Sequence, residues 1–376
     1  MRIPLMALAV PVVIVSAAAV YSAARPAAGE VRTFYIAADE VPWDYVAGGR
    51  NQIEDHPFVD SADFTTSGRH LYPTRYVKAL YREYTDSTFT RVKERAPEWQ
   101  HLGFLGPLIR AEVGDSIRIV FRNRASFPAG MHPHGVFYEK DSEGAPYADG
   151  TSGADKADDA VPPGGSHVYT WTVPERAGPG PADHGSVLWM YHSHTDEVRD
   201  VNTGLIGPMI VYDRGTLRDG RPHGIDREMV VMFAQNHEEM SWYAPRNLPT
   251  LATDPPVLPP GAIFPFFVFF SVNGYTHGAL PLETMTLRKG ETVRWYVFAS
   301  TGDFDFHTPH WHGNTVLIHG MRTDVGALEP MEMIIADMVP DDPGTWFFHC
   351  HVSDHMMAGM QARYRVVDAP AGRAAG

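Results

Sequence analysis

The stretch Trp346–Met360 reads WFFHCHVSDHMMAGM and holds the only cysteine of the chain, Cys350, between two histidines. Its first part is aromatic and is bounded by a turn, which predicts a β-strand. Residues two apart on a strand point to the same side, so His349 and His351 lie side by side while Cys350 faces the opposite side. This spacing suits metal binding from a rigid strand.

The His-x-His spacing occurs four times. The other pairs are His132 with His134, His192 with His194, and His310 with His312. They stand at corresponding places in two similar halves, each with a His-x-His-Gly and a later aromatic strand that carries a second pair. Ordinary surface or core histidines do not explain four pairs in such a repeat, so we expect all four to bind metal.

The duplication predicts two domains, residues 30–215 and 225–368, joined by a Gly- and Arg-rich segment at 214–224. The 376 residues suit two domains of about 150 residues each. The 34 glycines and 31 prolines indicate many turns between short strands, so we expect an all-β fold of two β-sandwiches. The Pro-rich stretch 245–265 is predicted to be a long surface loop.

The formal net charge is -14, which argues against a nucleic-acid partner because phosphate binding needs clustered Lys and Arg. A single cysteine cannot form an internal disulfide. Residues 1–24 combine a basic start, an apolar run and small residues, which predicts an export signal and a periplasmic or extracellular protein. A retained membrane anchor is the alternative, which Pro4 and Pro11 disfavour.

Cys350 has candidate partners around it in the sequence. A thiolate, two imidazoles and a weak axial methionine form the ligand set of a blue-copper electron-transfer site. The matching residues are His307, Cys350, His355 and Met360. Their counterparts in the first half are Ala129, Ser193, Val198 and Thr203, none of which is a good copper ligand. We therefore expect one blue site, in the second half, linked through Cys350 to a second metal centre.

These motifs resemble the signature of the multicopper oxidase family, His-Cys-His-x-x-x-His-x-x-x-x-Met preceded by His-x-x-His-x-His-Gly. The resemblance covers nearly all of the chain after the signal. Several stretches of the first half are similar to the branch of ceruloplasmin and the coagulation-factor A domains. These are Tyr81–Asp86, Phe104–Leu108, His132–Val136 and Gly204–Pro208.

The resemblance implies a cupredoxin Greek-key β-sandwich in both domains. It also implies four copper ions per chain: one type 1 ion, one type 2 ion and two type 3 ions. His132 and His310 would bind the type 2 ion. The type 3 pair would be held by His134, His192, His194, His312, His349 and His351. Dioxygen would be reduced to water there, with electrons supplied from the Cys350 copper.

Two further expectations follow from the resemblance. Asp149 matches an acidic residue that orients water and passes protons near the type 2 copper, although Asp before Gly is also common in turns. Two-domain members with the blue site in the second domain resemble a ring of three chains, with each three-copper cluster shared between neighbours. We therefore expect a homotrimer.

The residues around the predicted blue site bear on the choice of reductant. Asp354 matches a carboxylate of the family's iron site, but residues 264–271, where the family's ferroxidase has a Glu and a His, read FPFFVFFS. Iron needs oxygen ligands, so a Phe-rich wall favours a phenolic reductant in a laccase-like reaction. Fe(II) is the alternative, as is Cu(I) bound by methionines near the copper motifs.

Three other classes fit less well. A copper nitrite reductase lacks the type 3 pairs and carries its blue site in the first domain. A non-catalytic binding module would not need complete ligand sets. A copper carrier would not need a cysteine wired between two histidines.

Overall fold

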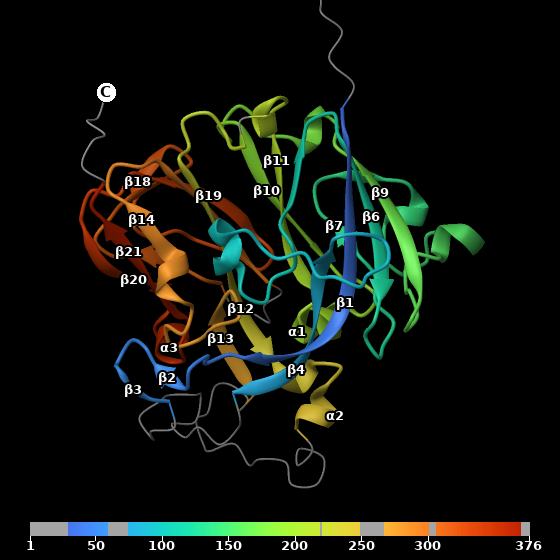
Figure 1. The fold of residues 1–376 in the computed structure, drawn as a ribbon, viewed down its shortest axis with the longest axis horizontal. Coiled ribbons are helices and arrows are strands. Elements are labelled where there is room, and N and C mark those ends of the chain that lie inside the picture. Colours follow the sequence, from blue (N-terminus) through green and yellow to red (C-terminus); the bar gives the residue numbers. More distant parts are fainter. Residues whose placement is uncertain (1–28, 59–73, 219, 249–266, 301–305, 370–376) are drawn as a thin grey trace, which may run out of the picture.

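The computed structural model describes residues 29–58, 74–218, 220–248, 267–300 and 306–369. The predicted signal, residues 1–24, and most of the predicted loop at 245–265 lie outside these ranges. The described chain forms two β-sandwiches side by side (Figure 1), and the predicted all-β class is confirmed.

The first sandwich pairs a five-stranded sheet, in the order β4-β1-β6-β9-β8, with a four-stranded sheet, in the order β5-β11-β10-β7. Its strands are β1 (Val31–Asp44), β4 (Arg75–Tyr84), β5 (Ile109–Glu112), β6 (Ser116–Asn123), β7 (His132–Pro133), β8 (Phe137–Tyr138), β9 (Ser166–Thr172), β10 (Ser186–His192) and β11 (Ile206–Tyr212). The pairs β1/β6 and β5/β11 are parallel, so the chain crosses between the sheets.

The second sandwich pairs a six-stranded sheet, β13-β12-β15-β19-β17-β18, with a four-stranded sheet, β14-β21-β20-β16. Its strands are β12 (Arg227–His237), β13 (Val268–Val272), β14 (Thr286–Arg288), β15 (Val293–Ala299), β16 (Pro309–Trp311), β17 (Val316–Ile318), β18 (Met321–Thr323), β19 (Met333–Met338), β20 (Gly344–Cys350) and β21 (Gln361–Val367). Its parallel pairs β12/β15 and β14/β21 repeat those of the first sandwich. The repeat in the sequence is therefore a repeat of the fold.

The remaining elements are short. They are the strands β2 (Arg50–Asn51) and β3 (His56–Pro57), the helices α1 (Glu197–Thr203), α2 (Ala244–Asn247) and α3 (Ser353–Met357), and the 3-10 helices η1 (Pro97–Leu102), η2 (Lys140–Ser142), η3 (Gly153–Lys156), η4 (Glu175–Ala177), η5 (Thr216–Arg218), η6 (Glu238–Met240) and η7 (Leu282–Met285). The division of strands supports the domain boundaries that we predicted, 30–215 and 225–368, which we keep as a proposal.

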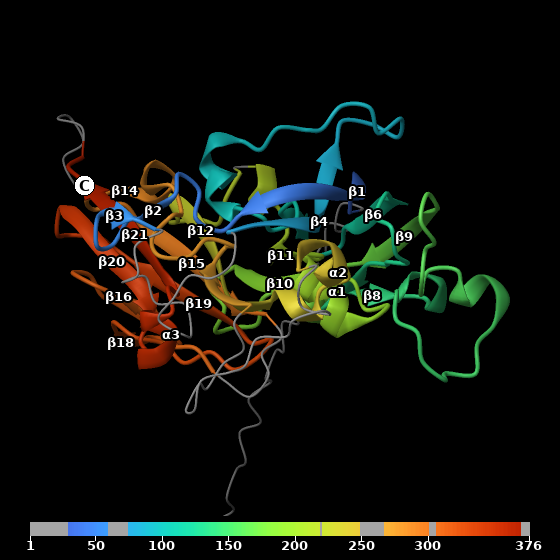
Figure 2. The same ribbon diagram turned by 90° about the horizontal axis from the view of Figure 1, so that it is seen from below.

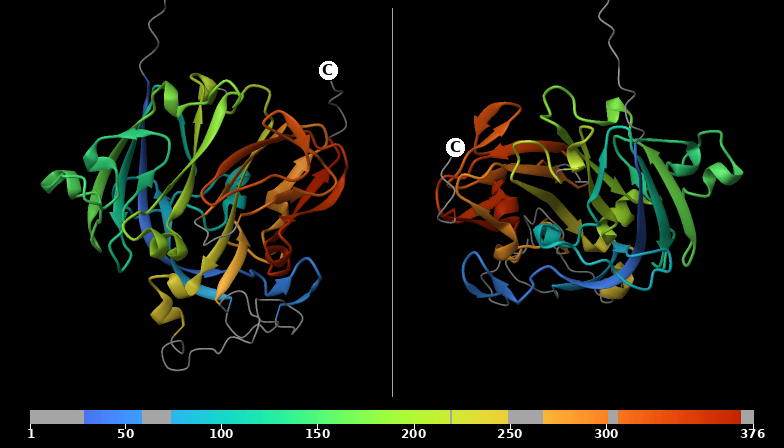
Figure 3. Two further views of the ribbon diagram at one scale, coloured as in Figure 1. Left: turned by 180° about the vertical axis from the view of Figure 1, so that it is seen from behind. Right: turned by 45° about the horizontal axis from the view of Figure 1, so that its top comes forward.

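Burial along the strands explains how the two sandwiches join. Strand β6 alternates, with Ile117, Ile119 and Phe121 buried and the residues between them facing outward, as in a sheet with one face in a core. Strands β11 and β12 are instead covered on both faces, apart from Arg227 at the start of β12. Their outer faces share one apolar cluster, so the four-stranded sheet of the first sandwich packs on the six-stranded sheet of the second (Figure 3).

The N-terminal strand connects both halves. Strand β1 starts in the first sandwich, and the chain then runs beneath the second one to β2 and β3 (Figures 1 and 2). Trp43 Nε1 donates to the carbonyl of Gly274 at 2.7 Å, and the amide of Gln52 donates to the carbonyl of His277 at 2.9 Å. These contacts attach the N-terminal segment, which begins in the first sandwich, to the second sandwich.

Candidate metal centres

Cys350, His307 and His355 converge in the core of the second sandwich. Cys350 ends β20, His355 lies on α3 and His307 precedes β16. The Cys350 sulfur lies 3.9 Å from His307 Nδ1 and 3.6 Å from His355 Nδ1, and the two nitrogens are 3.2 Å apart. All three side chains are at most 2% exposed. One soft thiolate and two imidazoles aimed at a common point fit a blue-copper ion.

The backbone fixes this arrangement. The amide of Cys350 donates to the carbonyl of Met360 at 3.1 Å, and the amide of Met360 donates to the carbonyl of His355 at 3.0 Å. Met360 is fully buried in the same core, so its position agrees with the predicted set. The amide of Thr308 points at the Cys350 sulfur at 3.3 Å, a contact that favours the thiolate form.

The first sandwich gathers its four paired histidines at one place. Their ring centroids are 5.2 to 5.7 Å apart, and His134 Nε2 lies 3.0 Å from His192 Nε2. Antiparallel pairing of β7 and β10 sets His132 opposite His192. Burial lowers the pKa of His134 to about 4, and it also lowers the pKa values of His132 and His192. Neutral imidazoles at pH 7 are the form that binds metal.

The second sandwich repeats this cluster with His310, His312, His349 and His351. Their ring centroids are 4.5 to 5.5 Å apart, and His312 Nε2 lies 3.1 Å from His349 Nε2. Strand pairing sets His310 opposite His349. Burial lowers the pKa of His349 to about 4. His349 Nδ1 lies 2.7 Å from the carbonyl of Cys350, which leaves Nε2 for a metal.

The two four-histidine sets are separate. Among the residues that the structure describes, each ring contact of these eight histidines with another of the eight stays within its own sandwich. In contrast, the Cys350 site and the second set are adjacent, because Cys350 is bonded to His349 and His351. The eight histidines that the sequence assigns to one cluster therefore lie, within this chain, in two separate sets of four.

The counterpart of the Cys350 site in the first sandwich holds no soft ligand. Ser193 Oγ donates to Asp200 Oδ2 at 2.6 Å and accepts from the amide of Gly130 at 3.1 Å. Val198, in the place of His355, is 53% exposed, and its side chain has no ligand atom. The serine, the acid and the exposed valine support the prediction of a single blue site.

The two predicted acidic residues lie in different surroundings. The carboxylate of Asp149 contacts Lys140 and Lys156, each at 2.9 Å, and accepts from Thr151. The hydrogen bond from Lys140 holds the pKa of Asp149 well below its usual range, so at neutral pH it is an anion without a proton to give. Asp354 is partly exposed on α3, directly before His355.

The structure adds contacts that the sequence does not indicate. The Gln235 side-chain nitrogen lies 3.2 Å from His355 Nε2, and the Phe270 ring lies 4.9 Å from the His355 ring. Asp324 Oδ2 lies 3.6 Å from His310 Nε2, in a segment that pairs with His310 through Val325. Phe270 belongs to the Phe-rich stretch at residues 264–271, whereas Gln235 and Asp324 belong to no recognisable motif and reach the histidines through strands distant in sequence.

Comparison with known proteins agrees with this geometry. Residues 101–216 and 261–370 each match a family profile described as "Multicopper oxidase". The chain is 42% identical to hephaestin of Mus musculus over 349 residues, 42% identical to "Ferroxidase HEPHL1" of Homo sapiens over 342, and 37% identical to ceruloplasmin of Rattus norvegicus over 338. These alignments cover 91%, 89% and 89% of this chain but only 30%, 29% and 31% of those proteins.

Solved structures share the fold at lower identity. The multicopper oxidase mgLAC aligns with a TM-score of 0.57 and 19% identity, over 92% of this chain and 88% of that one. A copper nitrite reductase from Nitrosomonas europaea aligns with a TM-score of 0.57 and 15% identity, over 92% and 98%. These likenesses confirm the predicted cupredoxin-like architecture.

Within the described residues, the helices are all too short to cross a membrane. The family profiles match both halves of the chain, and the sequence relatives extend over about nine-tenths of it. The chain therefore belongs to the multicopper oxidase family, and it is similar to the ceruloplasmin-like branch of that family.

Proposed function

We propose that this chain oxidises a reductant one electron at a time and reduces dioxygen to water. One observation carries this proposal: Cys350 belongs to one convergent ligand set while His349, its neighbour in the chain, belongs to another. Two sites joined by covalent bonds suit a reaction in which oxidation and reduction occur at different places.

Copper fits both kinds of site by donor chemistry. Bound copper would supply one-electron exchange at the first site and the reduction of dioxygen at the second. We assign the ligands as the family resemblance implies, with four ions per chain. His307, Cys350, His355 and Met360 would hold type 1 copper, His132 and His310 type 2, and His134, His192, His194, His312, His349 and His351 type 3.

The protein prepares these ligands before any metal arrives. Burial keeps His134 and His349 neutral, so no proton has to leave them at pH 7. Backbone carbonyls next to His192 and His349 occupy Nδ1 and direct Nε2 into each cluster. Asp149 stays in the proposal as an anion that orients water, with Lys140 and Lys156 as its fixed partners.

Fe(II) is the reductant that we propose. Its support is the similarity to a protein named as a ferroxidase, the carboxylate of Asp354 beside His355, and the overall acidic charge of -14. The phenolic reductant that the sequence first suggested has less support, because Phe267, Phe269 and Phe270 are at most 5% exposed. The residues at 264–266 lie outside the described chain.

Oxygen uptake by the copper-loaded protein tests the proposal. We expect Fe(II) to support faster uptake than a simple phenol or Cu(I). Asp354→Asn should slow the Fe(II) reaction and leave uptake with the phenol unchanged, whereas Asp342→Asn, an exposed control on another loop, should change neither. If none of the three reductants supported oxygen uptake, the proposed oxidase activity would be contradicted. Faster uptake with the phenol than with Fe(II) would contradict Fe(II) as the reductant.

We also propose a homotrimer in which neighbouring chains complete each eight-histidine cluster. Separate half-clusters within one chain support it, as do exposed apolar side chains on both sandwiches. In the second sandwich these are Leu317, Met321, Val325 and Val339, and in the first they are Tyr147 and Val168. Light scattering should give three times the chain mass, and a fully copper-loaded monomer would refute the assembly.

Export to the periplasm or the cell exterior remains a proposal as well. Its basis is the predicted signal at residues 1–24, which lies outside the described structure. Mass spectrometry of the protein recovered from the producing cells should show a chain that starts after this segment. An intact N-terminus on a membrane-bound protein would instead support the retained anchor.

A further inference from the structure

Asp158 is a buried acid that the proposed function does not yet use. Its side chain is 0% exposed. Oδ2 accepts a hydrogen bond from the amide of Gly144 at 2.7 Å, whereas Oδ1 has no partner among the described residues. A carboxylate held in this way costs free energy unless it supports something else.

The Gly144 amide belongs to the peptide bond whose carbonyl is that of Glu143. That carbonyl lies 2.7 Å from His132 Nδ1. One rigid, planar peptide group therefore joins Asp158 on one side to a proposed type 2 copper ligand on the other. An acceptor on its N–H increases the electron density on its carbonyl oxygen, which strengthens the bond from His132 Nδ1–H.

The surroundings leave this peptide little freedom. Gly144 has φ +70°, and a Cβ there would lie 2.3 Å from the carbonyl oxygen of Met131, so only glycine fits so close to the segment that carries His132. The Tyr169 hydroxyl donates to the carbonyl of Asp158 at 2.9 Å and accepts from the amide of Met131 at 3.2 Å. Tyr169 thus ties the acid to the same segment.

In the described part of the second sandwich, the counterpart histidine lacks this link. His310, the counterpart of His132, has a buried Nδ1 without a partner among the described residues. The two proposed type 2 ligands therefore differ: the Glu143 carbonyl holds His132 Nδ1, whereas His310 has Asp324 Oδ2 3.6 Å from its Nε2 and no partner on Nδ1 among the described residues.

We propose that Asp158 is the positioning residue for His132, acting through the peptide between Glu143 and Gly144. This inference rests on the proposed function insofar as it assigns copper to His132. Asp158 fixes the proton on His132 Nδ1 and leaves the Nε2 lone pair directed into the cluster. Partners of this kind typically change metal affinity by about 10- to 100-fold.

The test compares Asp158→Ala with Asp158→Asn in the full-length protein. The alanine variant removes the acceptor, whereas the asparagine keeps an oxygen for the Gly144 amide without the charge. We expect Asp158→Ala to lower the affinity for type 2 copper by about 10-fold or more in chelator competition. The electron paramagnetic resonance spectrum of that copper should also change. Asp158→Asn should recover most of the affinity, and the blue absorbance of the Cys350 site should persist in both variants.

Asp159→Asn is the matched control. Asp159 is the next residue, is also buried, and pairs with Lys156 instead of the Glu143–Gly144 peptide, so type 2 copper should stay unchanged. Hydrogen exchange of the Gly144 amide in copper-free protein reports the link itself: it should accelerate in Asp158→Ala only.

The outcomes separate the two proposals. The positioning role would be overturned if Asp158→Ala bound type 2 copper with the affinity and the electron paramagnetic resonance spectrum of the wild-type protein. This holds with or without faster exchange at Gly144. The role would also be overturned if Asp158→Ala lost the blue absorbance to the same extent as type 2 copper. A general folding defect would then explain the change. Absence of type 2 copper from the wild-type protein would instead refute the proposed function.

Discussion

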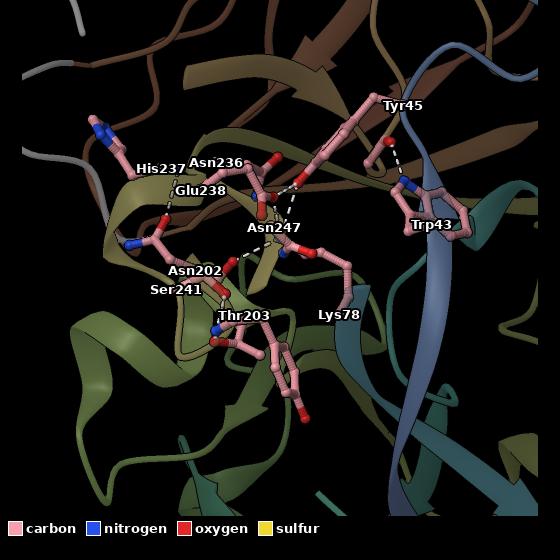
Figure 4. Close-up of polar contacts among 12 residues, drawn as sticks. Trp43, Tyr45, Lys78, Asn202, Thr203, Asn236, His237, Glu238, Ser241 and Asn247 are labelled. Carbon is pink, nitrogen blue, oxygen red and sulfur yellow. Dashed lines mark hydrogen bonds and ion pairs between the residues drawn. The ribbon is translucent and has the colours of Figure 1, made fainter. Parts of the chain in front are cut away.

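Lys78 and Glu238 form an ion pair that is buried completely, at 0% exposure for both side chains (Figure 4). Lys78 Nζ donates to Glu238 Oε1, to the Tyr45 hydroxyl at 2.9 Å and to the carbonyl of Asn202 at 2.7 Å, so all three of its protons are used. The pair joins β4, α1, η6 and the N-terminal segment. Burial lowers the pKa of Lys78 and raises that of Glu238, and their mutual attraction opposes both shifts.

Lys78→Met removes the charge and keeps most of the volume. The remaining carboxylate loses its cation, and its Oε2 already lacks a hydrogen-bond partner among the described residues. Three hydrogen bonds from a charged donor are worth about 4.5 to 9 kcal/mol in gross terms, from which relief of the ammonium desolvation is subtracted. Measured losses for one partner of such pairs are about 3 to 5 kcal/mol, and we expect a value in that range.

Urea unfolding of the copper-free protein measures this loss. Lys93→Met is the matched control, because Lys93 pairs with Glu83 at 2.9 Å but is 56% exposed, and it should cost at most about 1 kcal/mol. Lys78→Met combined with Glu238→Gln should recover much of the stability, since no charge is then left buried. A cost for Lys78→Met below about 1 kcal/mol, or equal to that of Lys93→Met, would refute the reasoning.

Other predictions concern single side chains. Cys350→Ser should abolish the blue colour and turnover while the histidine cluster still binds copper, and normal turnover in this variant would contradict the proposed link. Gln235→Glu should lower the reduction potential of the Cys350 site in a redox titration, because a carboxylate beside His355 stabilises the more positive, oxidised state; an unchanged or higher potential would contradict this. Burial lowers the pKa of His101 to about 3, so the unfolded chain binds a proton near pH 6.5 that the folded protein does not. The free energy of unfolding should therefore fall as the pH drops from 6.5 towards 3, and His101→Gln should reduce this slope by up to about 1.4 kcal/mol per pH unit in urea titrations.

Much of the fold could be read from local patterns. The alternation in β6 and the two His-x-His strands in each half predicted β-sandwiches and their duplication, because strand periodicity places ligands on one face whatever the surroundings. The Cys350 ligand set was predictable for the same reason, since three of its members lie within twelve residues of sequence. The choice of a phenolic reductant has less support, because the Phe-rich segment was read without its burial in the core.

Long-range packing decided which other side chains meet the predicted ligands and how the acids near them ionise. Asp158, Gln235 and Asp324 carry no motif: Gln235 and Asp324 approach the histidines directly, and Asp158 reaches His132 only through the Glu143–Gly144 peptide. A carboxylate such as Asp149 matches a pattern, yet its ionisation depends on two lysines that the fold brings to it. The sequence by itself determined which atoms are available as ligands, because side-chain chemistry and strand periodicity are local. Only the tertiary structure decided which are buried, which tautomer they hold and which partners they meet, because those depend on desolvation and on distances between remote segments.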